Sequence, residues 1–186
     1  QMERGSRSFL KDIVHWGAVN HSTLYAAFQN CSELENITAD DYPKGPFRSL
    51  QYTFQGCVKL TKINNLKGWS TQIQSVENMI YTFANCIAFQ GEGLEDWMPK
   101  NCEKFTGMFS GCTAFDRDLT KWAQHVSKAK DFQYMFYDCI RFVGKGLDNW
   151  NVSNGRNFSM MFYGCRTLAF KPDNWNVAKA EDMQDM

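Results

Sequence analysis

The most regular feature of the chain is the apolar pattern Phe-x-x-Cys, which occurs six times, at residues 28–31, 54–57, 83–86, 109–112, 136–139 and 162–165. Successive phenylalanines in this pattern lie 26, 29, 26, 27 and 26 positions apart. Self-similarity at such a period is typical of stacked-repeat proteins, in which each unit buries its apolar face against its neighbours. The sequence therefore predicts one elongated array.

Further apolar residues recur at fixed positions relative to the Phe-x-x-Cys pattern. Three residues after the cysteines come Leu34, Leu60, Phe89, Phe115, Phe142 and Leu168. Ahead of the pattern runs an aromatic column of Trp16, Tyr42, Trp69, Trp97, Trp122, Trp150 and Trp175. Tyr42 is placed in this column because it precedes Phe54 by 12 residues, as Trp16 precedes Phe28. An aromatic column could be a stacking platform for sugars or bases, but a fixed repeat position favours the edge of the core.

The spacing within a unit predicts one short strand and one short helix or 3-10 segment. Val76, Met79, Ile80 and Phe83 follow the i, i+3, i+4, i+7 spacing of a helix face, and residues 158–165 repeat it. Segments 32–37 and 58–63 are short and bounded by polar turns, as strands of a parallel ladder are. Met79, Met108, Met135 and Met161 are expected in the core. The fold class predicted is an α/β repeat with units of 25–29 residues.

The ends of the array are predicted to differ from its middle. Apolar pairs at residues 9–10 and 13–14 indicate a short amphipathic helix, so residues 1–15 are expected to form a lead-in and a capping helix. Residues 16–186 are expected to form a single array of about six units. Met183 matches Phe158, and the next phenylalanine would fall one residue past Met186. We therefore expect the array to be truncated in mid-repeat, with an uncapped terminal coil.

Composition and charge narrow the function classes. Apolar residues make up 44% of the 186 residues, which is enough for a continuous core. Lys plus Arg and Asp plus Glu both number 20, whereas nucleic-acid-binding surfaces carry a basic excess. No apolar run approaches the roughly 18 residues of a membrane-spanning helix. We expect no nucleic acid partner and no membrane insertion in this segment.

The residues that could carry chemistry favour a structural interpretation. Six of the seven cysteines belong to the repeat column and Cys102 lies outside it, and no Cys-x₂₋₄-Cys pair of a zinc site occurs. Buried free thiols are favoured over disulfides and over metal ligation. His15, His21 and His125 form no catalytic or metal-binding pattern. The loops at 91–93 and 144–146 read Gly-x-Gly, for which a bulge is favoured over a phosphate site. No catalytic residue, metal or cofactor is expected.

The repeat resembles a known family. Residues 28–37, FQNCSELENI, and 54–63, FQGCVKLTKI, are similar to the Phe-x-x-Cys-x-x-Leu-x-x-Ile core of BspA-type leucine-rich repeats. Later units are similar to the repeat of mycoplasma surface lipoproteins, in which Trp-Asp-Val-Ser leads to Met-Phe. In this chain Trp150-Asn151-Val152-Ser153 leads to Met161-Phe162. The resemblance implies a right-handed leucine-rich-repeat-like solenoid at the cell surface or outside the cell, used for adhesion or protein binding.

Binding is expected at charged positions that vary from unit to unit beside the strands. The candidates are Glu92, Arg117, Asp118, Arg141, Lys145 and Lys171. Their mixed signs suit a protein partner, or a glycan, because charge supplies register and specificity. The function predicted is a non-enzymatic interaction or adhesion module that uses the strand-side face. The alternative is a structural component of a larger assembly that packs through the open terminal coil.

Overall fold

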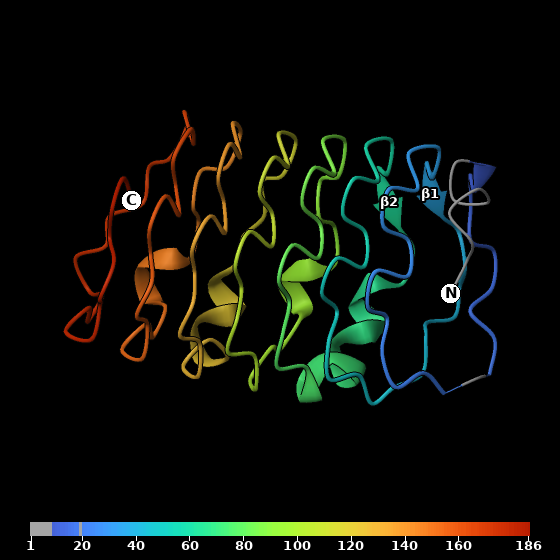
Figure 1. The fold of residues 1–186 in the computed structure, drawn as a ribbon, viewed down its shortest axis with the longest axis horizontal. Coiled ribbons are helices and arrows are strands. Elements are labelled where there is room, and N and C mark those ends of the chain that lie inside the picture. Colours follow the sequence, from blue (N-terminus) through green and yellow to red (C-terminus); the bar gives the residue numbers. More distant parts are fainter. Residues whose placement is uncertain (1–8, 19) are drawn as a thin grey trace.

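The protein is a stack of similar coils, one per repeat, which lie side by side along the long axis of the molecule (Figure 1). The computed structural model describes residues 9–18 and 20–186. Parallel β-bridges join Ser49 to Asn78, Asn78 to Lys104, Lys104 to Asp131, Asp131 to Asn157 and Asn157 to Asp182. One backbone ladder therefore runs through most of the stack, and it fixes the register of each repeat on the next.

Regular secondary structure is sparse in each coil. Strands β1 (Asn36–Ile37) and β2 (Lys62–Ile63) pair in parallel, with Asn36 opposite Lys62. Among the residues that the structure describes, 3-10 helices are found at η2 (Leu66–Ser75), η3 (Leu94–Asp96), η4 (Thr120–Gln124) and η5 (Leu147–Asn149). Figure 1 shows these helices in a row along one side of the stack. Each helix comes just before or includes a tryptophan of the aromatic column.

The α-helical spacing predicted for residues 76–83 and 158–165 does not produce helices. Tyr81 and Asn85 have φ angles of 50° and 59°, and Met160 and Gly164 have φ angles of 51° and 76°. Left-handed residues cannot continue a right-handed helix. The segments are turns instead, closed by bonds such as that from the Thr82 N–H to the Met79 carbonyl. These three-residue turns give nearly the apolar spacing of a helix.

The predicted strands and capping helix are also corrected. Only the last two residues of segments 32–37 and 58–63 are strand, because the Leu34 and Leu60 N–H groups bond back to Cys31 and Cys57 in turns. Residues 10–14 are not helical. Asp12 instead makes a parallel bridge with Asn36, so this segment extends the parallel pairing of β1 and β2 by one coil. The lead-in predicted for residues 1–8 lies outside the described residues.

The core consists of columns of the same residue type. Phe28, Phe54, Phe83, Phe109, Phe136 and Phe162 stack with ring centroids 5.5–5.9 Å apart. The predicted core methionines Met79, Met108, Met135 and Met161 are fully buried. Offset stacking of this kind adds to the free energy gained from burying apolar area. The Phe-x-x-Cys frame therefore predicted the interior correctly.

The aromatic column departs from its predicted composition at Tyr42. Trp16 packs edge-on against Trp69, with ring centroids 5.3 Å apart, and Tyr42 does not lie between them. A Cβ atom at Gly68 would lie 2.8 Å from the Tyr42 ring, and the Lys44 ammonium sits 4.1 Å from its centroid. Tyr42 is therefore held outside the column by the first turn of η2. Placing it in the column was wrong.

Candidate interaction surface

A set of charged side chains, which we call the charged ridge, lies on the 3-10 helices, on the loops that enter them and on the adjacent strand β2. It consists of Lys62, Lys67, Glu92, Asp96, Arg117, Asp118, Lys121 and Lys145. The ridge is built by the loops that enter the helices. Gly93 and Gly146, with φ angles of 95° and 89°, immediately precede η3 and η5 as their N-cap residues. The predicted Gly-x-Gly bulges are thus helix entries, and they set the positions of Glu92 and Lys145.

Asp118 and Lys145 come from neighbouring coils and form an ion pair with nitrogen and oxygen 2.8 Å apart. The Thr120 N–H also donates to the Asp118 carboxylate, at 3.0 Å. The hydrogen bond from the Lys145 ammonium is the main cause that lowers the pKa of Asp118 to about 2, with Thr120 contributing next. The same bond raises the pKa of Lys145. The pair therefore keeps both charges through the physiological pH range.

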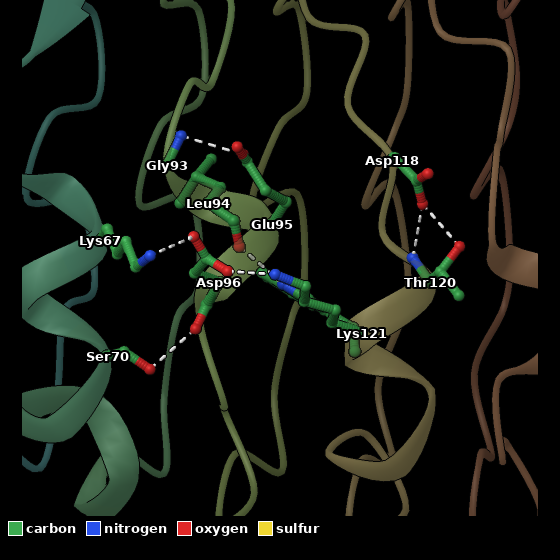
Figure 2. A network of polar contacts seen from close by, with 10 residues as sticks. Lys67, Ser70, Gly93, Leu94, Glu95, Asp96, Asp118, Thr120 and Lys121 are labelled. Atoms are coloured by element: carbon green, nitrogen blue, oxygen red, sulfur yellow. Dashed lines mark hydrogen bonds and ion pairs between the residues drawn. The ribbon is translucent and has the colours of Figure 1, made fainter.

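Asp96 lies between two lysines of the adjacent coils (Figure 2). Its carboxylate is 3.7 Å from the Lys67 ammonium and accepts a hydrogen bond from Lys121. The side chain of Asp96 is only 21% exposed. The hydrogen bond from Lys121 lowers the pKa of Asp96, with Lys67 adding to the effect. On its backbone side, the Asp96 carbonyl accepts a hydrogen bond of 2.8 Å from the Ser70 hydroxyl.

A groove of about 500 Å³ opens beside this network, lined by Lys67, Ser70, Asp96, Met98, Lys121 and His125. It is bounded by η2, η3 and η4. Two lysines around one aspartate leave a net positive charge at its edge. The groove offers the ammonium groups of Lys67 and Lys121 as hydrogen-bond donors, with the apolar side chain of Met98 beside them. This combination suits hydrogen bonding to an acidic or polar group of a partner.

The structure brings some of the predicted binding residues together and separates others. Asp118 and Lys145 form a pair, while the Arg117 guanidinium donates to the Gln90 carbonyl at 2.8 Å. Glu92 lies 3.9 Å from Lys62. Lys171 is exposed and immediately precedes Pro172. The Trp175 N–H donates to the Pro172 carbonyl, just as the Trp150 N–H donates to the Leu147 carbonyl one coil earlier. Lys171 continues the line of the ridge, whereas Arg141 is exposed and makes no ion pair with the described residues.

None of the six residues that line the groove was predicted from the sequence as a binding residue, and four of the six are ionisable: Lys67, Asp96, Lys121 and His125. A signal for two of them was present. Asp96 and Lys121 each stand immediately before a tryptophan of the aromatic column, in neighbouring units. When a charged residue stands immediately before a buried tryptophan in successive units, its side chain is expected to lie at the edge of the core. Lys67 and His125 have no such repeated counterpart.

The cysteine column is buried behind the ridge and does not contribute to it. The cysteines are free thiols, and Cys165 is the one that is partly exposed. Burial raises the pKa of the Cys102 and Cys112 thiols to about 12. Protonated thiols are poor nucleophiles and poor metal ligands. Within the described residues, no group of three or more His, Cys, Asp or Glu side chains could hold a metal ion.

Comparison with known families gives one match. The model of the family described as "Mycoplasma protein of unknown function, DUF285" matches residues 48–166 and again residues 123–186, which together exceed half of the chain. The two matched segments overlap, as expected for a repeat that can be aligned in more than one frame. No curated protein matches the chain. Among the described residues, no helix is long and apolar enough to cross a membrane.

Proposed function

This chain belongs to the DUF285 family of Mycoplasma proteins of unknown function, and we propose that it is a non-enzymatic module that binds a protein or a glycan through the charged ridge. The proposed architecture is a right-handed leucine-rich-repeat-like solenoid of the BspA type. The parallel ladder from Ser49 to Asp182 and the stacked phenylalanine column support this assignment. The resemblance to surface lipoprotein repeats supports a location at the cell surface or outside the cell.

One observation carries the proposal: the lysines of the ridge are exposed, yet each ion pair joins different coils. Lys67, Lys121 and Lys145 are 68–75% exposed, while their partners Asp96 and Asp118 are held at the ends of short helices. Exposed ion pairs contribute only about 0–1 kcal/mol each to stability. Their main effect is therefore to fix a pattern of charge on a rigid surface, which lowers the entropy cost of binding.

Binding can be tested with the purified chain on a printed glycan array and on immobilised extracellular-matrix proteins. A ridge variant carries Glu92, Arg117, Asp118 and Lys145 all changed to Ala. A control variant carries Lys11, Lys179, Glu181 and Asp185 changed to Ala, four exposed residues away from the ridge. Each variant removes two positive and two negative charges, so the net charge of the chain is unchanged.

We expect a probe to be bound by the parent chain and by the control variant, and to be lost by the ridge variant. Circular dichroism would establish that both variants fold. Equal binding by the ridge and control variants would show that the ridge is not the recognition surface. If the chain binds none of the probes and forms concentration-dependent polymers of itself, the alternative of a structural component that packs end to end would replace the adhesion proposal.

A further inference from the structure

A second row of charges runs along the stack, separate from the ridge. We call it the ladder row: Arg48, Glu77, Glu103, Lys130, Arg156 and Glu181. Each N–H from Glu77 to Glu181 donates to the carbonyl of the preceding member of the row, at 2.7–3.0 Å. Neighbouring members are therefore spaced as adjacent strands are, about 4.8 Å apart, and the row spans about 24 Å.

The side chains of the ladder row point to solvent and pair two by two within the chain. Arg48 pairs with Glu77 at 2.9 Å, Lys130 with Glu103 at 2.8 Å, and Arg156 with Glu181. All six side chains are between 45% and 80% exposed. A groove of about 650 Å³ lies along the first half of the row, lined by Arg48, Glu77 and Glu103 among others. The row is thus open to a partner along its length.

The order of signs in the ladder row is plus, minus, minus, plus, plus, minus. Read in reverse, the order has the opposite sign at every position. We propose that a second copy of this chain docks face to face and antiparallel on the ladder row. The two-fold axis lies between the two facing rows, perpendicular to the stack, level with the gap between Glu103 and Lys130. Such an isologous contact must be self-complementary, and this row is.

In this arrangement each charge faces an opposite charge of the second copy. Arg48 of one copy faces Glu181 of the other, Glu77 faces Arg156, and Glu103 faces Lys130. Because of the two-fold symmetry, each of these contacts occurs twice in the dimer. The intrachain pairs persist, so the facing pairs become a network of alternating charge. Charge complementarity of this kind fixes orientation and register more than it adds affinity.

Other arrangements of two copies are disfavoured by the same row. A parallel face-to-face dimer would place each of the six charges against itself. An antiparallel dimer shifted by one repeat would place Arg48 against Arg156 and Glu103 against its own copy. A shift in the other direction would oppose Glu77 to Glu181 and Lys130 to itself. Like charges in contact at an interface cost several kcal/mol, so one register is selected.

The row of bridging residues beside the ladder row agrees with the same axis. It consists of Ser49, Asn78, Lys104, Asp131, Asn157 and Asp182. Under the two-fold operation Lys104 faces Asp131, Asn78 faces Asn157, and Ser49 faces Asp182 of the second copy. Lys104 is exposed, whereas the Asn78, Asp131, Asn157 and Asp182 side chains also accept N–H bonds from their own chain, so this row permits the axis without selecting it. This second row contains no like-charge contact, although its residues were not used to place the axis.

Sedimentation equilibrium of the full chain tests the proposal. We expect a monomer–dimer equilibrium at low salt, about 20 mM NaCl, that weakens markedly at about 500 mM, because exposed charges are screened. Glu77→Arg and Arg156→Glu, each alone, should weaken the dimer about tenfold or more. The double variant E77R/R156E should recover an affinity close to that of the parent chain.

The double variant separates contacts between copies from contacts within a chain. It restores the facing pair of residues 77 and 156, while the intrachain pairs Arg48–Glu77 and Arg156–Glu181 stay broken. Lys59→Glu breaks an exposed intrachain pair with Glu33 elsewhere, and it should leave the dimer unchanged. If a charge-reversal variant does not fold, the neutral variants E77Q and R156Q can be measured in its place. A monomer at all concentrations up to about 200 µM, an oligomer larger than a dimer, or no recovery in the double variant would overturn the proposal.

Discussion

The thiol of Cys112 donates a hydrogen bond to the carbonyl oxygen of Phe83, one repeat earlier, with the sulfur and oxygen 3.0 Å apart. The same bond joins Cys57 to Phe28, Cys86 to Phe54, Cys139 to Phe109 and Cys165 to Phe136. The cysteine column therefore does more than fill space. Each thiol holds one coil to the previous coil, and the bond requires the thiol to keep its proton.

The cysteines are predicted to resist alkylation in the folded protein. At pH 8 a thiol with a pKa of about 12, as at Cys102 and Cys112, is ionised in only about one molecule in 10⁴, and the thiolate is the nucleophile. Iodoacetamide labelling followed by intact mass spectrometry should show little modification of native protein and seven labels in urea. Rapid labelling of the native chain at Cys112 would contradict the hydrogen-bonded thiol.

Two tryptophans are predicted to respond differently to the same substitution. The Trp122 indole N–H donates to the Leu94 carbonyl at 2.8 Å, whereas the Trp69 indole N–H is buried without a partner. Trp122→Phe removes a hydrogen bond as well as volume, so we expect it to lower the free energy of unfolding by about 2–3 kcal/mol. Trp69→Phe removes an unsatisfied donor, so it should cost about 1 kcal/mol less. Equal urea-unfolding free energies would refute the difference.

Substitution of Gly107 is predicted to destabilise the fold more than substitution of a glycine with open space around it. Its φ angle is 56°, and a Cβ atom would lie 2.1 Å from the Tyr81 ring. Gly17, with a φ angle of 77°, has no atom within 4 Å of the same position. Gly17→Ala should cost only the left-handed strain, about 1–2 kcal/mol, and Gly107→Ala about 1–3 kcal/mol more. Adding Tyr81→Ala to Gly107→Ala should remove the extra cost of the clash, as measured by urea unfolding.

The Asp118–Lys145 pair is predicted to give a small, acid-sensitive stabilisation. The folded pKa of Asp118 is lowered to about 2, so its contribution is present above the unfolded pKa of about 3.9 and is lost as pH falls through 2. Because the Asp118 side chain is 43% exposed, we expect about 0.5 kcal/mol at pH 7. Asp118→Asn should lose this amount at pH 7 and match the parent at pH 2. A pH-independent difference in urea midpoints would contradict the ion pair.

The local structure shows where sequence reasoning succeeded and where it failed. The periodic positions identified buried residues such as Phe83, Cys86 and Met79. They did not reveal the backbone conformation, because a chain of three-residue turns and a helix share nearly the same apolar spacing. Asn85 and Gly111 occupy equivalent left-handed positions in adjacent units, and their residue types are the ones that tolerate such angles. That column of Asn, Gly and Asp was the available signal for turns.

The sequence by itself determined the repeat period and the inward-facing side chains, because burial of an apolar face leaves a period that can be read directly. Only the tertiary structure decided which charges meet. Lys145 lies 27 residues from Asp118 and Lys121 lies 25 from Asp96, so each pair depends on the lateral register of two coils. Tyr42 is a second case, because η2 holds it out of the aromatic column although its sequence spacing matches that of Trp16. A sequence period fixes the average step of the stack, whereas a side-chain contact depends on the local backbone of both coils.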